Sequence, residues 1–155
     1  MAEVQVEAFI AAAPSTLYDM VSDVTRMGSW SPETASCRWV GGDTGPAVGA
    51  HFVGANQYGW RRWRTSCTVV AADPGRRSGF DVTAVGFPIS HWEYRFEPEG
   101  EGCRVVESWE DRRPWWMDRL STVVMGISDR PEHNRTGMTT TLERLRQAAE
   151  GDPTR

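Results

Sequence analysis

The most regular pattern of apolar and polar positions lies near the end of the chain, over residues 129–150. Charged side chains fill one side of this segment, and apolar side chains return at the spacing of one helical face. A helix with a single apolar stripe must bury that stripe against another element. The pattern therefore predicts one long amphipathic helix, whose stripe is formed by Met138, Leu142, Leu145 and Ala149.

Both ends of this helix carry the expected signals. Asp129 is followed three residues later by Glu132, with Pro131 inside the first turn, which is typical of an N-terminal cap. Gly151 directly follows the pattern and is typical of a helix end. We expect the helix to run between these signals without a break.

The first fifty residues predict a strand, a short helix and a long loop. Residues 4–8 alternate between apolar and polar side chains, which indicates a half-buried strand. Pro14 opens a short helix whose apolar side chains face inward as far as Val24, and residues 26–32 close it. Four glycines and one proline fall within residues 41–49, so this stretch is expected to be a loop.

Between residues 50 and 111, turn residues return at hairpin intervals and separate runs rich in Val, Thr and aromatic residues. This pattern predicts an antiparallel meander. Its clearest strand covers residues 90–97, and its partner covers residues 103–110. A turn centred on residues 100–101 places Phe96 opposite Val105, Tyr94 opposite Glu107 and Trp92 opposite Trp109, and it places His91 opposite Glu110 on the outer face as a solvated pair.

The segment from Arg112 to Ser128 is strongly apolar and contains the pair Trp115 and Trp116. It is too short and too interrupted by charge to span a membrane. We expect a mobile element at the rim of the sheet that controls entry to the interior. The tryptophan pair also offers a point of peripheral membrane contact.

The composition limits the class of protein. With 155 residues, of which 39% are hydrophobic, the chain can bury a core without the help of disulfide bonds or a metal ion. We expect one domain over residues 1–155. The net charge of −4 argues against a nucleic-acid partner, because domains that bind nucleic acid usually carry a basic face. The N-terminal sequence has no charged region ahead of an apolar run, so no signal peptide is expected. With no transmembrane segment, the expected location is the cytoplasm.

No disulfide framework or metal site is expected. Cys37, Cys67 and Cys103 are odd in number and show no CxxC spacing. His51 and His133 lie far apart in the chain, and neither has a third ligand nearby. The sequence therefore predicts neither a metal ion nor another cofactor.

Short segments in a fixed order carry a family resemblance, and together they span roughly residues 3–150. The segments are Ala13–Pro14, Val21–Val24, Trp30–Glu33, Gly49–Phe52, Val105–Trp109 and His133–Met138. In this order they resemble the START-like, polyketide cyclase/dehydrase (SRPBCC) superfamily, and their sequences are most similar to those of its actinobacterial members.

The resemblance implies an α+β helix-grip fold, in which a curved antiparallel sheet of about seven strands wraps around the long C-terminal helix. It also implies a deep apolar cavity between sheet and helix that accepts lipids, sterols, polyketides or other aromatic molecules. The superfamily shares no catalytic motif, so the fold leaves the chemistry open.

The tryptophan content supports such a cavity independently of the resemblance. Eight tryptophans in 155 residues is several times ordinary usage, and most fall on elements that would share one interior. They could equally fill the core of a curved sheet. Trp39 and Trp60 are expected in the scaffold or on the surface. The predicted ligand-contacting residues are Arg61, Trp63, Cys67, Phe80, Trp92, Tyr94, Trp109, Met138 and Leu142.

Glu107 is the candidate for chemistry, with Tyr94 beside it. In the predicted register this carboxyl lies among aromatic side chains, where desolvation would raise its pKa toward that of a general acid or base. The alternative is an inward-facing glutamate tied to Arg61 or to a backbone group. An inward Arg61 could instead grip a ligand carboxylate, whereas Arg62 and Arg64 are expected on the outer face.

Two classes of function follow from these residues. The first is binding of a hydrophobic small molecule, in which the cavity is the whole function. The second is a cofactor-free cyclase, aromatase or dehydratase that uses Glu107 and Tyr94. Because Glu107 is the one credible polar group of the predicted interior, binding is the leading interpretation. A weaker third class is a protein-interaction module with Trp115 and Trp116 at its surface.

Overall fold

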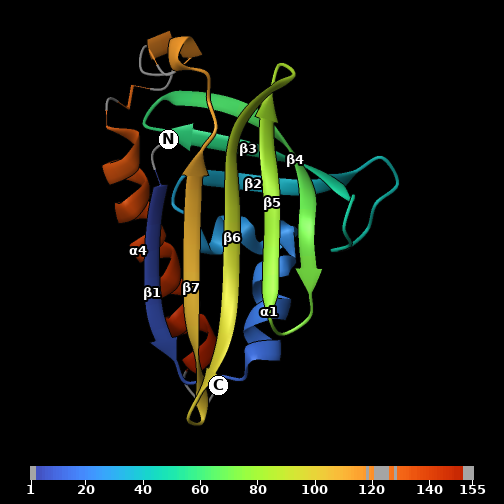
Figure 1. Cartoon of the computed structure of the whole chain (residues 1–155), viewed down its shortest axis with the longest axis vertical. Helices are drawn as coiled ribbons and strands as arrows, with labels where there is room; N and C mark the ends of the chain where they lie inside the picture. The colour runs from blue at the N-terminus through green and yellow to red at the C-terminus, as the bar shows by residue number, and fades with distance from the viewer. Residues whose placement is uncertain (1–2, 118, 121–125, 128, 152–155) are drawn as a thin grey trace.

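A computed structural model describes residues 3–117, 119–120, 126–127 and 129–151. It has an α+β fold in which a seven-stranded antiparallel sheet curves around one long helix (Figure 1). The strand order is β1-β7-β6-β5-β4-β3-β2. The strands are β1 (Glu3–Ile10), β2 (Thr34–Val40), β3 (His51–Tyr58), β4 (Arg61–Asp73), β5 (Arg77–Ala84), β6 (Phe87–Glu99) and β7 (Gly102–Asp111). The helices are α1 (Pro14–Ser22), α2 (Met27–Trp30) and α4 (Arg130–Glu150), with a 3₁₀ turn, η1 (Val24–Arg26).

The curvature of the sheet creates its interior. In Figure 1, β1, β7, β6 and β5 run along the long axis of the molecule, whereas β2 and β3 cross that axis. The helix α4 packs against β1 and β7, where Met138 joins Val4 and Trp109 in one apolar cluster. The helix-grip architecture predicted from the sequence is therefore confirmed.

The cap of α4 is also as predicted. The carboxylate of Asp129 accepts a hydrogen bond of 3.2 Å from the backbone N–H of Glu132, and Pro131 lies in the first turn. At the other end, the N–H of Gly151 donates to the carbonyl of Gln147. These contacts satisfy backbone groups that a helix end leaves unpaired.

The predicted register of β6 and β7 is confirmed at the residues that matter for the interior. Tyr94 is paired with Glu107, Trp92 with Trp109, and the turn falls at residues 100–101. On β1, Val6 is the partner of Glu107, so the glutamate lies on a strand with a neighbour on each side.

Two N-terminal elements differ from expectation. Residues 27–30 form the short helix α2, where a plain connection was expected, because the Asp23 side chain caps η1 and the chain then starts a new turn. The strand β2 was not singled out by its pattern, since its exposure does not alternate along the strand.

The expected rim element, residues 112–128, lies partly outside the described residues, which omit 118, 121–125 and 128. Residues 115–117 and 119–120 are helical. Trp115 is exposed, and the ring of Trp116 meets the ring of Phe87 edge to face at 5.3 Å. In the described part of the chain, no helix is long and apolar enough to cross a membrane.

Candidate ligand-binding site

A cavity of about 670 Å³ lies between the inner face of the sheet and α4. Its volume falls in the range of small-molecule sites, which is roughly 300–1,000 Å³. The helix contributes the side that carries Gly137 and Thr141, and the small size of these residues leaves room for the cavity. The strands β2 to β7 contribute the opposite wall.

Most of the residues predicted to contact a ligand line this cavity. They come from four neighbouring strands and from α4, and the inward positions of the strands follow their alternation. The predicted residues in the lining are Trp63, Cys67, Phe80, Trp92, Tyr94, Glu107, Trp109 and Met138.

Arg61 and Leu142 lie outside the lining. Leu142 is fully packed in the cluster that joins α1, α4 and β1. Arg61 shares a strand face with Trp63 but sits at the very start of β4, where its guanidinium stacks 4.4 Å from the ring centroid of Trp60. The alternative interpretation tied the carboxyl of Glu107 to Arg61 or to a backbone group. In the described part of the chain, Oε1 instead accepts from Tyr94, and Oε2 has no hydrogen-bond partner.

Aromatic rings form much of the wall. The rings of Trp92 and Trp109 lie 6.4 Å apart, and the rings of Phe52 and Phe80 meet edge to face at 5.2 Å. Phe52 was missed by sequence reasoning, although it is one of the most deeply buried side chains. The indole N–H of Trp92 donates 3.2 Å to the hydroxyl of Ser90, so its polar edge is satisfied while its face remains apolar.

Glu107 and Tyr94 form a buried polar pair in this wall. The hydroxyl of Tyr94 donates a hydrogen bond of 2.7 Å to Oε1 of Glu107. Glu107 is only 2% exposed, and its second oxygen, Oε2, is buried and has no hydrogen-bond partner among the described residues. A buried carboxyl oxygen without a partner is uncommon, because no hydrogen bond within the protein compensates for the loss of its hydration.

Burial determines the protonation of this pair. It raises the pKa of Glu107 from 4.5 to about 8, although the hydrogen bond from Tyr94 opposes the shift. Burial, and next the nearby carboxyl of Glu107, raise the pKa of Tyr94 well above 10. At neutral pH the carboxyl of Glu107 is therefore mostly protonated, and Tyr94 remains a hydrogen-bond donor.

A second set of polar lining residues lies at the N-terminal end of α4. The guanidinium of Arg130 bonds the Glu33 carboxylate at 2.9 Å and the Asn134 side-chain oxygen at 3.3 Å. The ring of His133 meets the ring of Tyr58 edge to face at 4.8 Å. Burial, followed by the charge of Arg130, lowers the pKa of His133, although the charge of Glu33 opposes the shift.

Sequence reasoning did not assign these polar residues to a site. Asn134 could have been found by its spacing, because it lies four residues before Met138 and so shares the inward face of the helix. The ion pair between Arg130 and Glu33 could not, since 97 positions separate its members.

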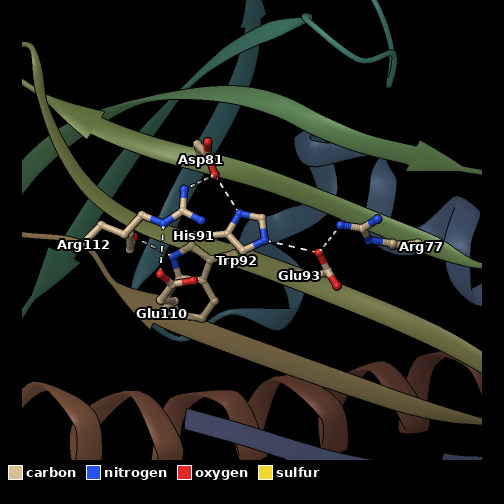
Figure 2. Close-up of polar contacts among 8 residues, drawn as sticks. Arg77, Asp81, His91, Trp92, Glu93, Glu110 and Arg112 are labelled. Carbon is tan, nitrogen blue, oxygen red and sulfur yellow. Dashed lines mark hydrogen bonds and ion pairs between the residues drawn. The ribbon is translucent and has the colours of Figure 1, made fainter. Parts of the chain in front are cut away.

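His91 lies between Ser90 and Trp92 on β6, which both line the cavity, so its side chain projects from the opposite face of the sheet. Figure 2 shows the polar network to which His91 belongs. It pairs with Glu110 in the strand register, as expected, but its ring does not contact that carboxylate. Its Nδ1 lies 2.7 Å from Asp81 and its Nε2 lies 3.2 Å from Glu93, because both neighbours project on the same outer face. Glu110 instead accepts a hydrogen bond of 3.4 Å from Arg112. The expected solvated pair is thus replaced by a network across three strands.

Candidate metal ligands are dispersed. Among the described residues, no group of three or more His, Cys, Asp or Glu side chains is arranged to hold a metal ion. His51 lies 3.7 Å from Asp43 near the start of β3.

Comparison with known proteins reveals both sequence and structural relatives. The model of a family described as polyketide cyclase / dehydrase and lipid transport matches residues 1–150. A polyketide-cyclase-like protein from Corynebacterium glutamicum, solved in solution, is 35% identical, with coverage of 96% of this chain and 91% of that chain and a TM-score of 0.62. The family itself is shown by the family model. The similarity to actinobacterial members is supported more weakly, by this one protein. None of the curated proteins compared matches the chain.

More distant structures share the fold. A crystal structure of a protein from Chromobacterium violaceum is 17% identical, with 97% and 98% of the two chains covered and a TM-score of 0.72. The di-domain ARO/CYC protein StfQ of the steffimycin biosynthetic pathway is 15% identical, with a TM-score of 0.71 over 96% of this chain and 50% of that chain. At these identities the likeness concerns the fold alone.

Proposed function

We propose that this chain, which belongs to the family described as polyketide cyclase / dehydrase and lipid transport, binds a hydrophobic small molecule in the cavity between the sheet and α4. The ligand would have an aromatic, polyketide-like or lipid-like body. The observation that carries the proposal is the cavity itself, which has a volume of about 670 Å³ and whose wall includes the rings of Trp63, Phe80, Trp92 and Trp109. Such a concave apolar space with a few convergent polar groups is the usual form of a small-molecule site.

The proposed contacts follow from the lining. Trp92 and Trp109 present ring faces on one side, and Met138 presents a flexible apolar side chain from the helix. Trp63, Cys67 and Phe80 extend the apolar wall. In this account residues 1–155 act as one domain whose interior is the binding site.

Native mass spectrometry tests this proposal. We expect the purified protein, either as isolated or after exposure to the hydrophobic dye Nile red, to carry one small molecule that is lost on denaturation. Thr65→Trp should occupy part of the cavity and weaken loading, because Thr65 belongs to the lining. Ser66→Trp is the matched control, since Ser66 is exposed on the other face of the same strand. Absence of both a retained and a loaded molecule contradicts the proposal.

A second candidate function is supported by the pair of Glu107 and Tyr94. A cofactor-free cyclase, aromatase or dehydratase needs one group that moves a proton at a site shielded from water. In the dehydration of a hydroxyl placed β to a ketone, the ionised fraction of Glu107 would take a proton from the carbon between the two groups. Glu107 would then give this proton to the departing hydroxyl, so that the C–H and C–O bonds break, a carbon–carbon double bond forms, water leaves and no cofactor is consumed. The raised pKa of Glu107, about 8, suits such an exchange near neutral pH.

Glu107→Gln separates the two functions. A carrier should keep its ligand affinity within a few-fold, whereas an enzyme should keep binding and lose turnover. Loss of binding together with turnover would leave no support for a catalytic role of Glu107.

The exposed tryptophans support only a weaker third function. Trp115 is 78% exposed, and Trp116 is 42% exposed beside Phe87. Together they offer a surface for a partner protein or for peripheral contact with a membrane.

A further inference from the structure

One oxygen of the cavity wall has no hydrogen-bond partner in the described structure. Oε2 of Glu107 is buried, and Glu107 itself belongs to the cavity lining. Because an unpaired buried carboxyl oxygen costs free energy, a ligand that supplies a partner there gains over one that does not. Oε2 therefore selects for the polar group of the ligand, whereas the aromatic walls select for its body.

The hydrogen bond at Oε1, the other oxygen of Glu107, determines whether Oε2 donates or accepts. Tyr94 donates its hydroxyl proton to Oε1, so Oε1 is the accepting oxygen of the carboxyl. In a neutral carboxylic acid the proton then lies on Oε2, which makes Oε2 a donor. In an ionised carboxylate both oxygens would accept, and the charge would be buried with a single hydrogen bond.

The surroundings favour the neutral form. Burial and the bond from Tyr94 are the two influences on the pKa of Glu107, and burial is the larger. On the neighbouring strand β1, the register partner of Glu107 is the uncharged Val6. The helix α4 contributes Met138 and Thr141 to the lining of the same cavity. The hydroxyl of Thr141 already donates to the carbonyl of Gly137 at 2.8 Å. The other ionisable groups that line the cavity are Glu33, Tyr58, Arg113, Arg130, His133 and Arg144, together with the thiols of Cys37 and Cys67.

We propose that neutral Glu107 donates a hydrogen bond from Oε2 to a carbonyl oxygen of the ligand, so that the cavity selects apolar ketones over equally apolar hydrocarbons and phenols. This inference rests on the proposed binding function and names the chemical class of its ligand. Tyr94 acts as a positioning residue, because its bond to Oε1 leaves the proton of the acid on Oε2, the oxygen without a partner among the described residues.

Three tricyclic probes of one shape test the proposal. Fluorene carries no polar group, fluorenone carries a carbonyl that only accepts, and hydroxyfluorene carries a hydroxyl that donates and accepts more weakly than the carbonyl. Below pH about 7, where Glu107 is neutral, we expect fluorenone to bind roughly tenfold more tightly than fluorene, as one added hydrogen bond allows. As pH rises through about 8, the advantage of fluorenone should disappear and hydroxyfluorene should gain.

Two substitutions make the test specific. Glu107→Gln keeps an N–H donor and cannot ionise, so the preference for fluorenone should persist without pH dependence. Glu107→Leu removes the donor, so fluorenone and fluorene should bind equally. Glu110→Gln is the control, because this carboxylate lies on the outer face of the same strand and should change nothing. Circular dichroism confirms that each variant is folded.

The outcomes separate this inference from the binding function. If fluorene and fluorenone bind wild type equally at low pH, or if Glu107→Leu keeps the preference, the ketone assignment is wrong and binding stands. A preference for hydroxyfluorene over fluorenone at low pH also overturns it, because a donating Oε2 should favour the carbonyl, which is the stronger acceptor of the two. Failure of all three probes to bind contradicts the binding function and the ketone assignment together.

Discussion

Tyr94 and Glu107 face each other across β6 and β7, and the tyrosine hydroxyl donates a hydrogen bond of 2.7 Å to Oε1 of the glutamate. Both side chains are buried in the wall of the cavity. The pair therefore connects the packing of the sheet with the chemistry of the site, and its protonation should be visible in both stability and binding.

The first prediction concerns stability against pH. The pKa of Glu107 is about 8 in the folded protein and 4.5 in its usual range, so between these values the folded protein holds a proton that the unfolded chain has lost. Its contribution to the free energy of unfolding is complete below pH 4.5 and decreases as pH rises toward about 8, by at most about 1.4 kcal/mol per pH unit.

Urea denaturation of wild type and Glu107→Gln measures this contribution, since the amide does not titrate. The free energy of unfolding of the variant, relative to wild type, should increase with pH across this window and then level off. A difference that stays constant with pH would show that Glu107 ionises normally in the folded protein.

The second prediction concerns Tyr94→Phe. The hydrogen bond from Tyr94 lowers the pKa of Glu107 against the larger effect of burial, so its removal should raise that pKa above about 8. Titration of the Glu107 carboxyl carbon by NMR measures the shift directly. An unchanged or lower pKa would mean that the tyrosine does not stabilise the carboxylate.

The third prediction concerns the packing of α4. Met138 is 2% exposed and contacts Val4 and Trp109, so Met138→Asp buries a charge without a partner. We expect a loss of about 3–5 kcal/mol in the free energy of unfolding. Thr139→Asp, at the next and exposed position, should cost about 1 kcal/mol or less. Similar losses in both variants would place Met138 outside the core.

The sequence predicted the elements whose pattern is local. Alternation along β6 and a two-residue turn are enough to pair Tyr94 with Glu107, because a slip by one residue would turn every aromatic side chain of the strand outward. The long helix was predicted with its cap because Asp129 and Glu132 are close in the chain.

Features that depend on distance in space were not predicted. Alternation along β4 places Arg61 on the same face as Trp63. The sequence does not show how far the cavity extends along this strand, and the lining does not include Arg61. The bond between Arg130 and Glu33 joins segments with no shared pattern. The size of the cavity depends on volume left empty between side chains, which no periodicity records.

The most direct test of the account is a titration of tryptophan fluorescence with Nile red in three proteins. Wild type and Trp60→Ala should show the same saturable change, because Trp60 is 79% exposed and lies outside the cavity lining. Trp92→Ala should bind about tenfold more weakly, through the loss of about 1–2 kcal/mol of ring contact. If the change is not saturable, or if Trp92→Ala binds as wild type does, the cavity is not the binding site.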